Sequence, residues 1–195
     1  MAGLKSFLNS IAPILGVSPL ALYERQRALV NLGILKAVRG RGPGSGVPLT
    51  SYNVAAVVIS VLATDNLSEV DRRVSAIIRA KPDLSDLPTR QLDNEWPGSY
   101  DFCHAVSAVL VGTPILGELK YVDAIRVTRC WRAQVVWGRG TPNLKIDYFL
   151  PDHIRRVVQP LPVRITAELE SSEIERLSSF TLGALSQTAS EGEDE

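Results

Sequence analysis

The sequence predicts an α+β fold, with helices in the first half of the chain and an antiparallel sheet in the second. Before residue 112, apolar residues recur mainly at helical spacing. After residue 121, apolar and polar residues alternate, which is typical of strands. Apolar residues make up 45% of the 195 positions, which is enough for a substantial core.

The first predicted helix covers residues 3–15, where five apolar residues follow helical spacing: Leu4, Phe7, Leu8, Ile11 and Leu15. Pro13 weakens its end, because proline has no amide hydrogen. Gly16 then indicates a tight turn. A helix followed by such a turn is the expected first half of a helix-turn-helix.

A second helix is predicted directly after this turn. Ser18 suits the N-cap and Pro19 the first helical position, while Gly33 ends the helix in a left-handed conformation. A short strand over residues 34–38 and a glycine-rich loop over 39–46 follow. This order predicts a winged helix-turn-helix.

The N-terminal region is basic, although the whole chain has a formal net charge of zero. Residues 1–50 carry a net charge of +5, and residues 168–195 carry −7. A basic cluster favours a polyanionic partner, because phosphate contacts dominate affinity for nucleic acids. The acidic tail either competes for the basic region or is solvated without a partner. The basic cluster comprises Arg25, Arg27, Lys36, Arg39 and Arg41.

A third helix is predicted over residues 51–64, with Thr50 as its N-cap. Its residues are nearly all apolar, so we expect it to be buried between the basic region and the rest of the chain. A strand is the alternative, because β-branched residues are abundant, but the length and the cap favour a helix. Residues 81–99 are rich in Pro, Asp and Ser and are expected to connect two domains.

Two domains and a tail are therefore predicted. Residues 1–80 form an N-terminal helical winged helix-turn-helix domain with extra helices, followed by a mixed domain with an antiparallel sheet over residues 100–180. Residues 181–195 are small and acidic and are expected to be a disordered tail. The mixed domain combines an apolar helix over 100–111, strands over 121–128, 130–137, 144–150 and 163–169, and a short helix over 173–180.

The residue pattern predicts no catalytic, metal or cofactor site. Cys103 and His104 are adjacent on a helix, where neighbouring side chains point about 100° apart, so they do not form a nucleophile–base pair. The segment GRGPGSG lacks the Gly-Lys-Ser/Thr of a phosphate-binding loop, and the two cysteines indicate neither a disulfide nor a zinc site. We therefore expect a cytoplasmic protein that is not an enzyme, needs no cofactor and spans no membrane.

The segment LGVSPLALYERQRALVNLGIL resembles the helix-turn-helix of winged-helix regulators of bacteria and phages. The shared pattern is an apolar residue, Gly-Val-Ser, a helix with regularly spaced leucines, and Leu-Gly-Ile-Leu before a wing. The resemblance covers residues 4–48. It differs at Pro43 and in the missing helix that usually comes first. It implies a set of DNA-facing residues: Ser18, Tyr23, Arg25 and Arg27, with Arg39 and Arg41 in the wing.

Leu22, Leu29 and Leu32, with Gln26 between them, form an apolar stripe on the second helix. The helical wheel places four residues on the other side: Leu20, Tyr23, Glu24 and Arg27. Reading bases in the major groove requires side chains from the N-terminal half of such a helix, so Arg27 suits guanine and Leu20 a thymine methyl group. Glycines would let the loop arginines approach the DNA backbone or minor groove. The complete candidate site is Ser18, Leu20, Tyr23, Glu24, Arg25, Arg27, Lys36, Arg39 and Arg41.

Two classes of function fit these observations. In the first, the chain binds double-stranded DNA sequence-specifically, as a bacterial or phage transcription regulator or as a DNA-packaging protein similar to a small terminase subunit. It would form a homo-oligomer, because one such module usually needs a second copy for affinity. The mixed domain would bind an effector, which the sequence does not identify, a partner or another copy. In the second class, the chain is a protein-interaction or oligomerisation module, and its arginines form only a solvated helix face and a flexible hairpin tip.

Overall fold

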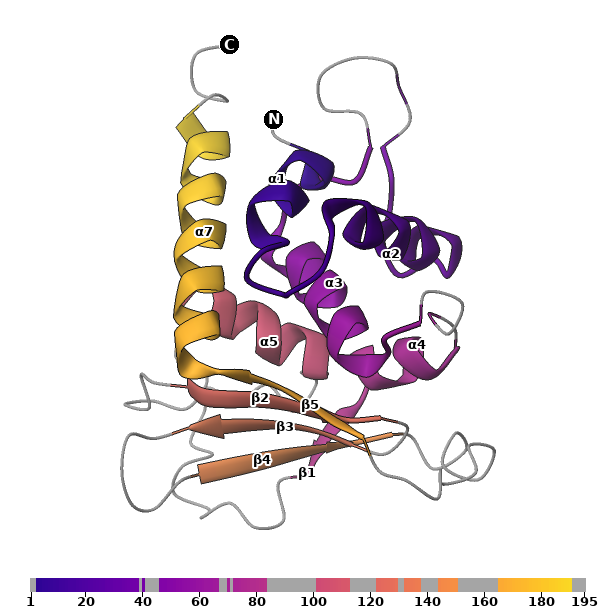
Figure 1. The fold of residues 1–195 in the computed structure, drawn as a ribbon, viewed down its shortest axis with the longest axis vertical. Helices are drawn as coiled ribbons and strands as arrows, with labels where there is room; N and C mark the ends of the chain where they lie inside the picture. Colours follow the sequence, from indigo (N-terminus) through magenta and orange to yellow (C-terminus); the bar gives the residue numbers. More distant parts are fainter. Residues whose placement is uncertain are drawn as a thin grey trace.

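The computed structural model describes residues 3–38, 40, 46–66, 70, 72–83, 101–112, 122–129, 132–137, 144–150 and 165–190. In this part of the chain the helices lie on one face of an antiparallel sheet (Figure 1), so the predicted mixed α+β fold is confirmed. The helices are α1 (Leu4–Ile11), α2 (Pro19–Asn31), α3 (Ser51–Ala63), α4 (Arg72–Ile78), α5 (Phe102–Leu110) and α7 (Ser171–Ser190). The strands are β1 (Lys81–Asp83), β2 (Val122–Thr128), β3 (Arg132–Trp137), β4 (Leu144–Phe149) and β5 (Thr166–Glu170).

The strand order in the sheet is β1-β4-β3-β2-β5, and each neighbouring pair is antiparallel. Val135 of β3 lies opposite Ile125 of β2 and Ile146 of β4, and all three side chains are buried. β1 begins at Lys81, inside the segment that was predicted to be a connection. That prediction is wrong for residues 81–83, because a three-residue edge strand is stabilised by pairing with β4 rather than by its own sequence.

Helix α3 lies at the centre of the molecule, as the sequence predicts. Residues 54–60 are completely buried, and the helix packs against α2, α4, α5 and the sheet. The Thr50 side chain accepts a hydrogen bond from the Asn53 amide at 3.1 Å, which confirms the predicted N-cap. The buried apolar residues of α1, α2 and α3 join those of the sheet and α7 in a single cluster.

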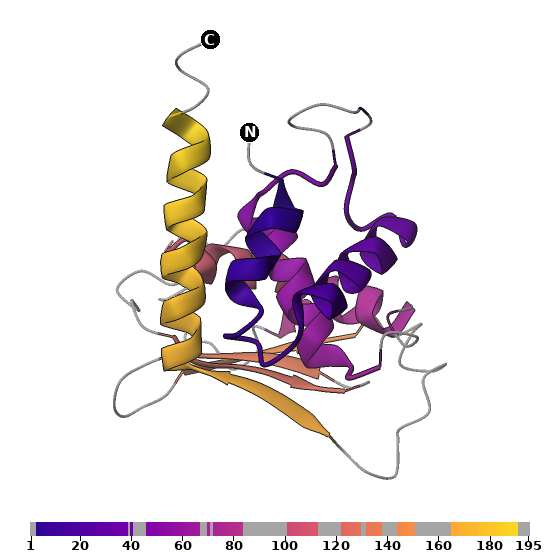
Figure 2. The ribbon, with the colours of Figure 1, turned by 45° about the horizontal axis from the view of Figure 1, so that its top comes forward.

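Helix α7 extends to Ser190 along one side of the helical layer, next to α1 (Figures 1 and 2). The predicted disorder is therefore wrong for residues 181–190, whereas residues 191–195 lie outside the described part of the chain. Burial of one side of the helix explains the difference. Leu177 and Thr181 are fully buried, and α7 packs against α1, α5, β2 and β5. Composition alone did not reveal these contacts.

The N-terminal segment forms the predicted helix, turn and helix. Gly16 and Gly33 have φ angles of 64° and 70°, which are left-handed values that glycine adopts without strain. The predicted strand over residues 34–38 is reduced to an isolated bridge between Val38 and Gly46, and a second bridge joins Gly3 to Pro48. Residues 46–48 thus lie between the start of α1 and the segment that follows α2.

None of the helices described is long and apolar enough to cross a membrane.

Candidate nucleic-acid interface

The outer side of α2 carries most of the residues that the sequence selected. Leu20 is 68% exposed, Ser18 and Arg27 are also exposed, and Tyr23 and Glu24 are half-buried. Lys36 is exposed beyond the end of the helix, whereas Arg39 and Arg41 lie outside the described residues. We call the set Ser18, Leu20, Tyr23, Glu24, Arg27 and Lys36 the α2 surface.

Two side-chain contacts order the α2 surface. The Arg27 guanidinium donates to both carboxylate oxygens of Glu24 at 3.1 Å. The ammonium group of Lys5 lies 4.5 Å from the centre of the Tyr23 ring, a cation–π contact between α1 and α2. The sequence did not select Lys5, although it contacts Tyr23 of the α2 surface. The helical spacing placed it on the polar side of the first helix, but spacing does not show which residue of the second helix lies beside it.

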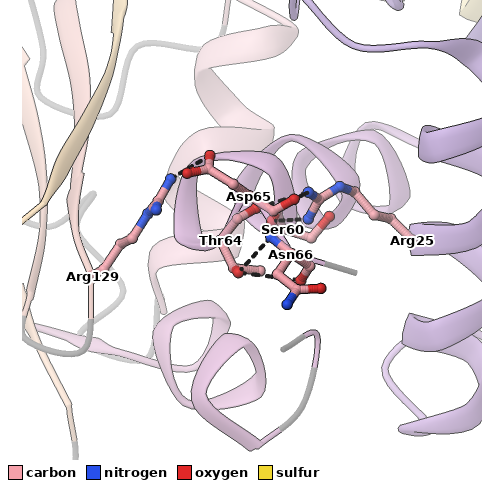
Figure 3. A network of polar contacts seen from close by, with 6 residues as sticks. All are labelled: Arg25, Ser60, Thr64, Asp65, Asn66 and Arg129. Carbon is pink, nitrogen blue, oxygen red and sulfur yellow. Dashed lines mark hydrogen bonds and ion pairs between the residues drawn. The ribbon is translucent and has the colours of Figure 1, made fainter. Parts of the chain in front are cut away.

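The prediction that Arg25 faces DNA is wrong. Its side chain is 3% exposed and points into the protein (Figure 3). Its guanidinium donates to the main-chain oxygens of Ser60 at 2.6 Å, Thr64 at 2.8 Å and Asp65 at 3.3 Å. The last carbonyl groups of a helix have no partner within it, so Arg25 supplies donors where α3 ends. Arg25 is two positions from Arg27, about 200° around the helix, and therefore lies on the opposite side.

The loop after α3 extends this polar cluster to the sheet. The Asp65 carboxylate accepts a hydrogen bond from Arg129, the residue that follows β2. This hydrogen bond lowers the pKa of Asp65 below its ordinary value. Burial lowers the pKa of Arg25, and repulsion from Arg129 adds to this effect. The cluster, shown in Figure 3, connects α2, the end of α3 and the end of β2.

Cys103 and His104 do not form a reactive pair. The Cys103 thiol is fully buried and contacts the main-chain oxygen of Tyr52 at 3.6 Å, and burial raises its pKa. His104 Nδ1 lies 2.8 Å from the carboxylate of Asp101, the N-cap of α5. Its ring packs against Tyr52 with a centroid separation of 4.8 Å, and its side chain is 48% exposed in the first turn of α5. His153 is outside the described residues, and among those described no cluster of three or more His, Cys, Asp or Glu could hold a metal ion.

Two neighbouring arginines of α2 provide a direct test of the structural role of Arg25. Replacing Arg25 with alanine removes the donors for three main-chain oxygens, so we expect the free energy of unfolding to fall by about 3 kcal/mol. Arg27→Ala is the matched control, and should change it by less than about 0.5 kcal/mol, because its ion pair is exposed. Urea denaturation measures both values. Equal losses of unfolding free energy in the two variants would contradict the assignment of Arg25 to the core and Arg27 to the surface.

No family model, curated protein or solved structure matches this chain.

Proposed function

We propose that this protein binds double-stranded DNA through the α2 surface, with α1, α2 and the segment that follows them acting as a winged helix-turn-helix. The observation that carries the proposal is the order and pairing of the segments. Residue 3 pairs with Pro48, α1 and α2 follow with a tight turn between them, and Val38 then pairs with Gly46. A winged helix has this order of segments, with strands at the positions where this chain has two isolated bridges.

Helix α3 supplies apolar packing behind the two helices. A helix-turn-helix needs a third helix behind it to bury its apolar side. Helix α3 packs against α2 and is held to it by the Arg25 hydrogen bonds. In this proposal α3 completes the module from a later position in the chain, and α2 is the recognition helix.

The exposed groups on α2 suit base reading in the major groove. Leu20 projects from the first turn of the helix, where its methyl groups would contact a thymine methyl. Arg27 would reach guanine or a phosphate after leaving Glu24, and this costs little because the Arg27 side chain is 61% exposed and its ion pair is solvated. Lys36 would contact the backbone beyond the end of the helix.

This surface fits a transcription regulator and a DNA-packaging protein equally, and both would act in the cytoplasm. Two half-sites one helical turn apart would require two copies. In the first role, the mixed half of the chain would respond to an effector or partner. In the second, it would assemble with further copies.

A second candidate function, self-association through α7, is favoured by the surface of that helix. Residues 177–190 contain no charged residue. Two apolar side chains among them, Phe180 and Leu182, are 45% and 42% exposed. A hollow of about 340 Å³ lies between α7 and α1, next to Phe180, and another of about 380 Å³ lies between α7, α5 and β2, next to Leu182. Depletion of charge around exposed apolar side chains is typical of the core of a protein–protein interface.

DNA binding can be tested by the anisotropy of a labelled random-sequence duplex, titrated at several salt concentrations. We expect the double variant Arg27→Ala/Lys36→Ala to weaken binding by about tenfold or more. It should also reduce the slope of log Kd against log salt by about 2, because two phosphate or base contacts are lost. Arg176→Ala, an exposed arginine on α7, is the control and should bind like the unaltered protein. Equal affinity of the double variant would contradict the assignment to the α2 surface.

Self-association can be measured without DNA. Light scattering at tens of micromolar should give a mass of twice the 21.2 kDa of one chain. Phe180→Glu should give the mass of a single chain, because a buried unpaired charge at an interface is costly. Ser172→Glu, exposed near the start of the same helix, should leave the mass doubled. If the unaltered protein has the mass of one chain, this second function is excluded at that concentration.

A further inference from the structure

Asp65 is contacted from two sides by elements that are far apart in the sequence. Its carboxylate accepts a hydrogen bond from Arg129 at the end of β2, and its main-chain oxygen accepts one from Arg25 of α2. The Arg129 amide in turn donates to the main-chain oxygen of Ile165, directly before β5, at 2.9 Å. Figure 3 shows Arg129 and Arg25 on opposite sides of the loop that carries Asp65. One residue therefore contacts both the outer part of the sheet and the middle of α2.

The two arginines have few alternatives to this arrangement. Arg25 is almost completely buried, and the Arg129 side chain is only 14% exposed. The Nε atom of each is buried and has no hydrogen-bond partner in the described part of the chain. The two guanidinium groups repel each other, while Asp65 attracts both. Removal of the Asp65 charge would leave the mostly covered Arg129 guanidinium without its ion-pair partner.

The position of α2 depends on the same contacts. Arg25 lies in the middle of α2, and its three main-chain acceptors belong to the end of α3 and to the loop that Asp65 occupies. If Arg129 moves with the sheet, the Asp65 carboxylate follows it and the loop carbonyls shift relative to Arg25. Helix α2 must then shift or lose hydrogen bonds, because a buried guanidinium has no water to replace them.

We propose that Asp65 is a positioning residue that couples the β2–β5 side of the sheet to helix α2. A ligand or partner that displaces this side of the sheet would change the position or stability of α2 through Arg129, Asp65 and Arg25. The coupling itself is a property of the free protein. Its effect on DNA affinity rests on the proposed function, and the two are measured separately.

Amide hydrogen exchange of the DNA-free protein tests the coupling. Asp65→Asn and Arg129→Met should each accelerate the exchange of α2 amides by about fivefold, the lower end of typical couplings between sites. The double variant should exceed neither single variant, because both changes break the same link. Asp65→Glu keeps the negative charge, so its α2 amides should exchange more slowly than those of Asp65→Asn. If the two substitutions acted only by disturbing the main chain of the loop, this difference would not appear.

Matched controls come from a second arginine–aspartate pair on the sheet. Arg132 of β3 and Asp147 of β4 are 3.8 Å apart. Arg132→Met and Asp147→Asn should leave α2 exchange unchanged. The proposal is overturned if Asp65→Asn and Arg129→Met leave α2 exchange at the unaltered rate, or if the control pair accelerates it equally.

The anisotropy titration with the random duplex completes the test. Asp65→Asn and Arg129→Met are expected to raise Kd by about fivefold, and the control pair should not change it. If α2 exchange responds as expected but the unaltered protein does not bind the duplex, the coupling holds and the proposed DNA binding fails. If the unaltered protein binds and the α2 exchange does not respond, DNA binding holds and the coupling fails.

Discussion

The burial of α3 is the constraint on which the rest of the structure depends. A helix without charged residues, covered on all sides, must find partners for the carbonyl groups at its C-terminal end. Arg25 of α2 donates to two of the carbonyl groups there, and Asp65 in the next loop accepts a hydrogen bond from Arg129, which directly follows β2. The requirement of one helix end therefore fixes the N-terminal helices and the sheet to each other.

Because of this constraint, the two sides of α2 have different roles. Its inner side carries Leu22, Arg25 and Leu29, which are buried, and its outer side carries Leu20 and Arg27, which face solvent. Because residues 25 and 27 lie about 200° apart on a helix, one arginine holds the helix in place while the other is available to a ligand. The basic cluster in the sequence contains both the buried and the exposed arginine, and the sequence alone does not distinguish them.

The local features of the fold were predictable because neighbouring residues determine them. Ser18 and Thr50 cap helices as expected, the turn at Gly16 and the helix end at Gly33 are left-handed, and residues 132–135 of β3 alternate between the outside and the core. The predictions are wrong where contacts between residues far apart in the sequence determine the structure. Strand β1 exists through its pairing with β4, α7 continues past residue 180 because its inner side is buried, and Arg25 has its partners 35 to 40 positions away. The α2 surface remains a prediction for the same reason, since its partner would be another molecule.

The most direct test of the central claim, that the outer side of α2 binds duplex DNA, is an amide NMR titration at low salt. Added duplex should first shift the amide signals of Ser18, of residues 20–27 and of Lys36, and should leave those of the strands and the middle of α7 largely unchanged. Shifts confined to the sheet or α7, or no shifts with excess duplex, would contradict the account.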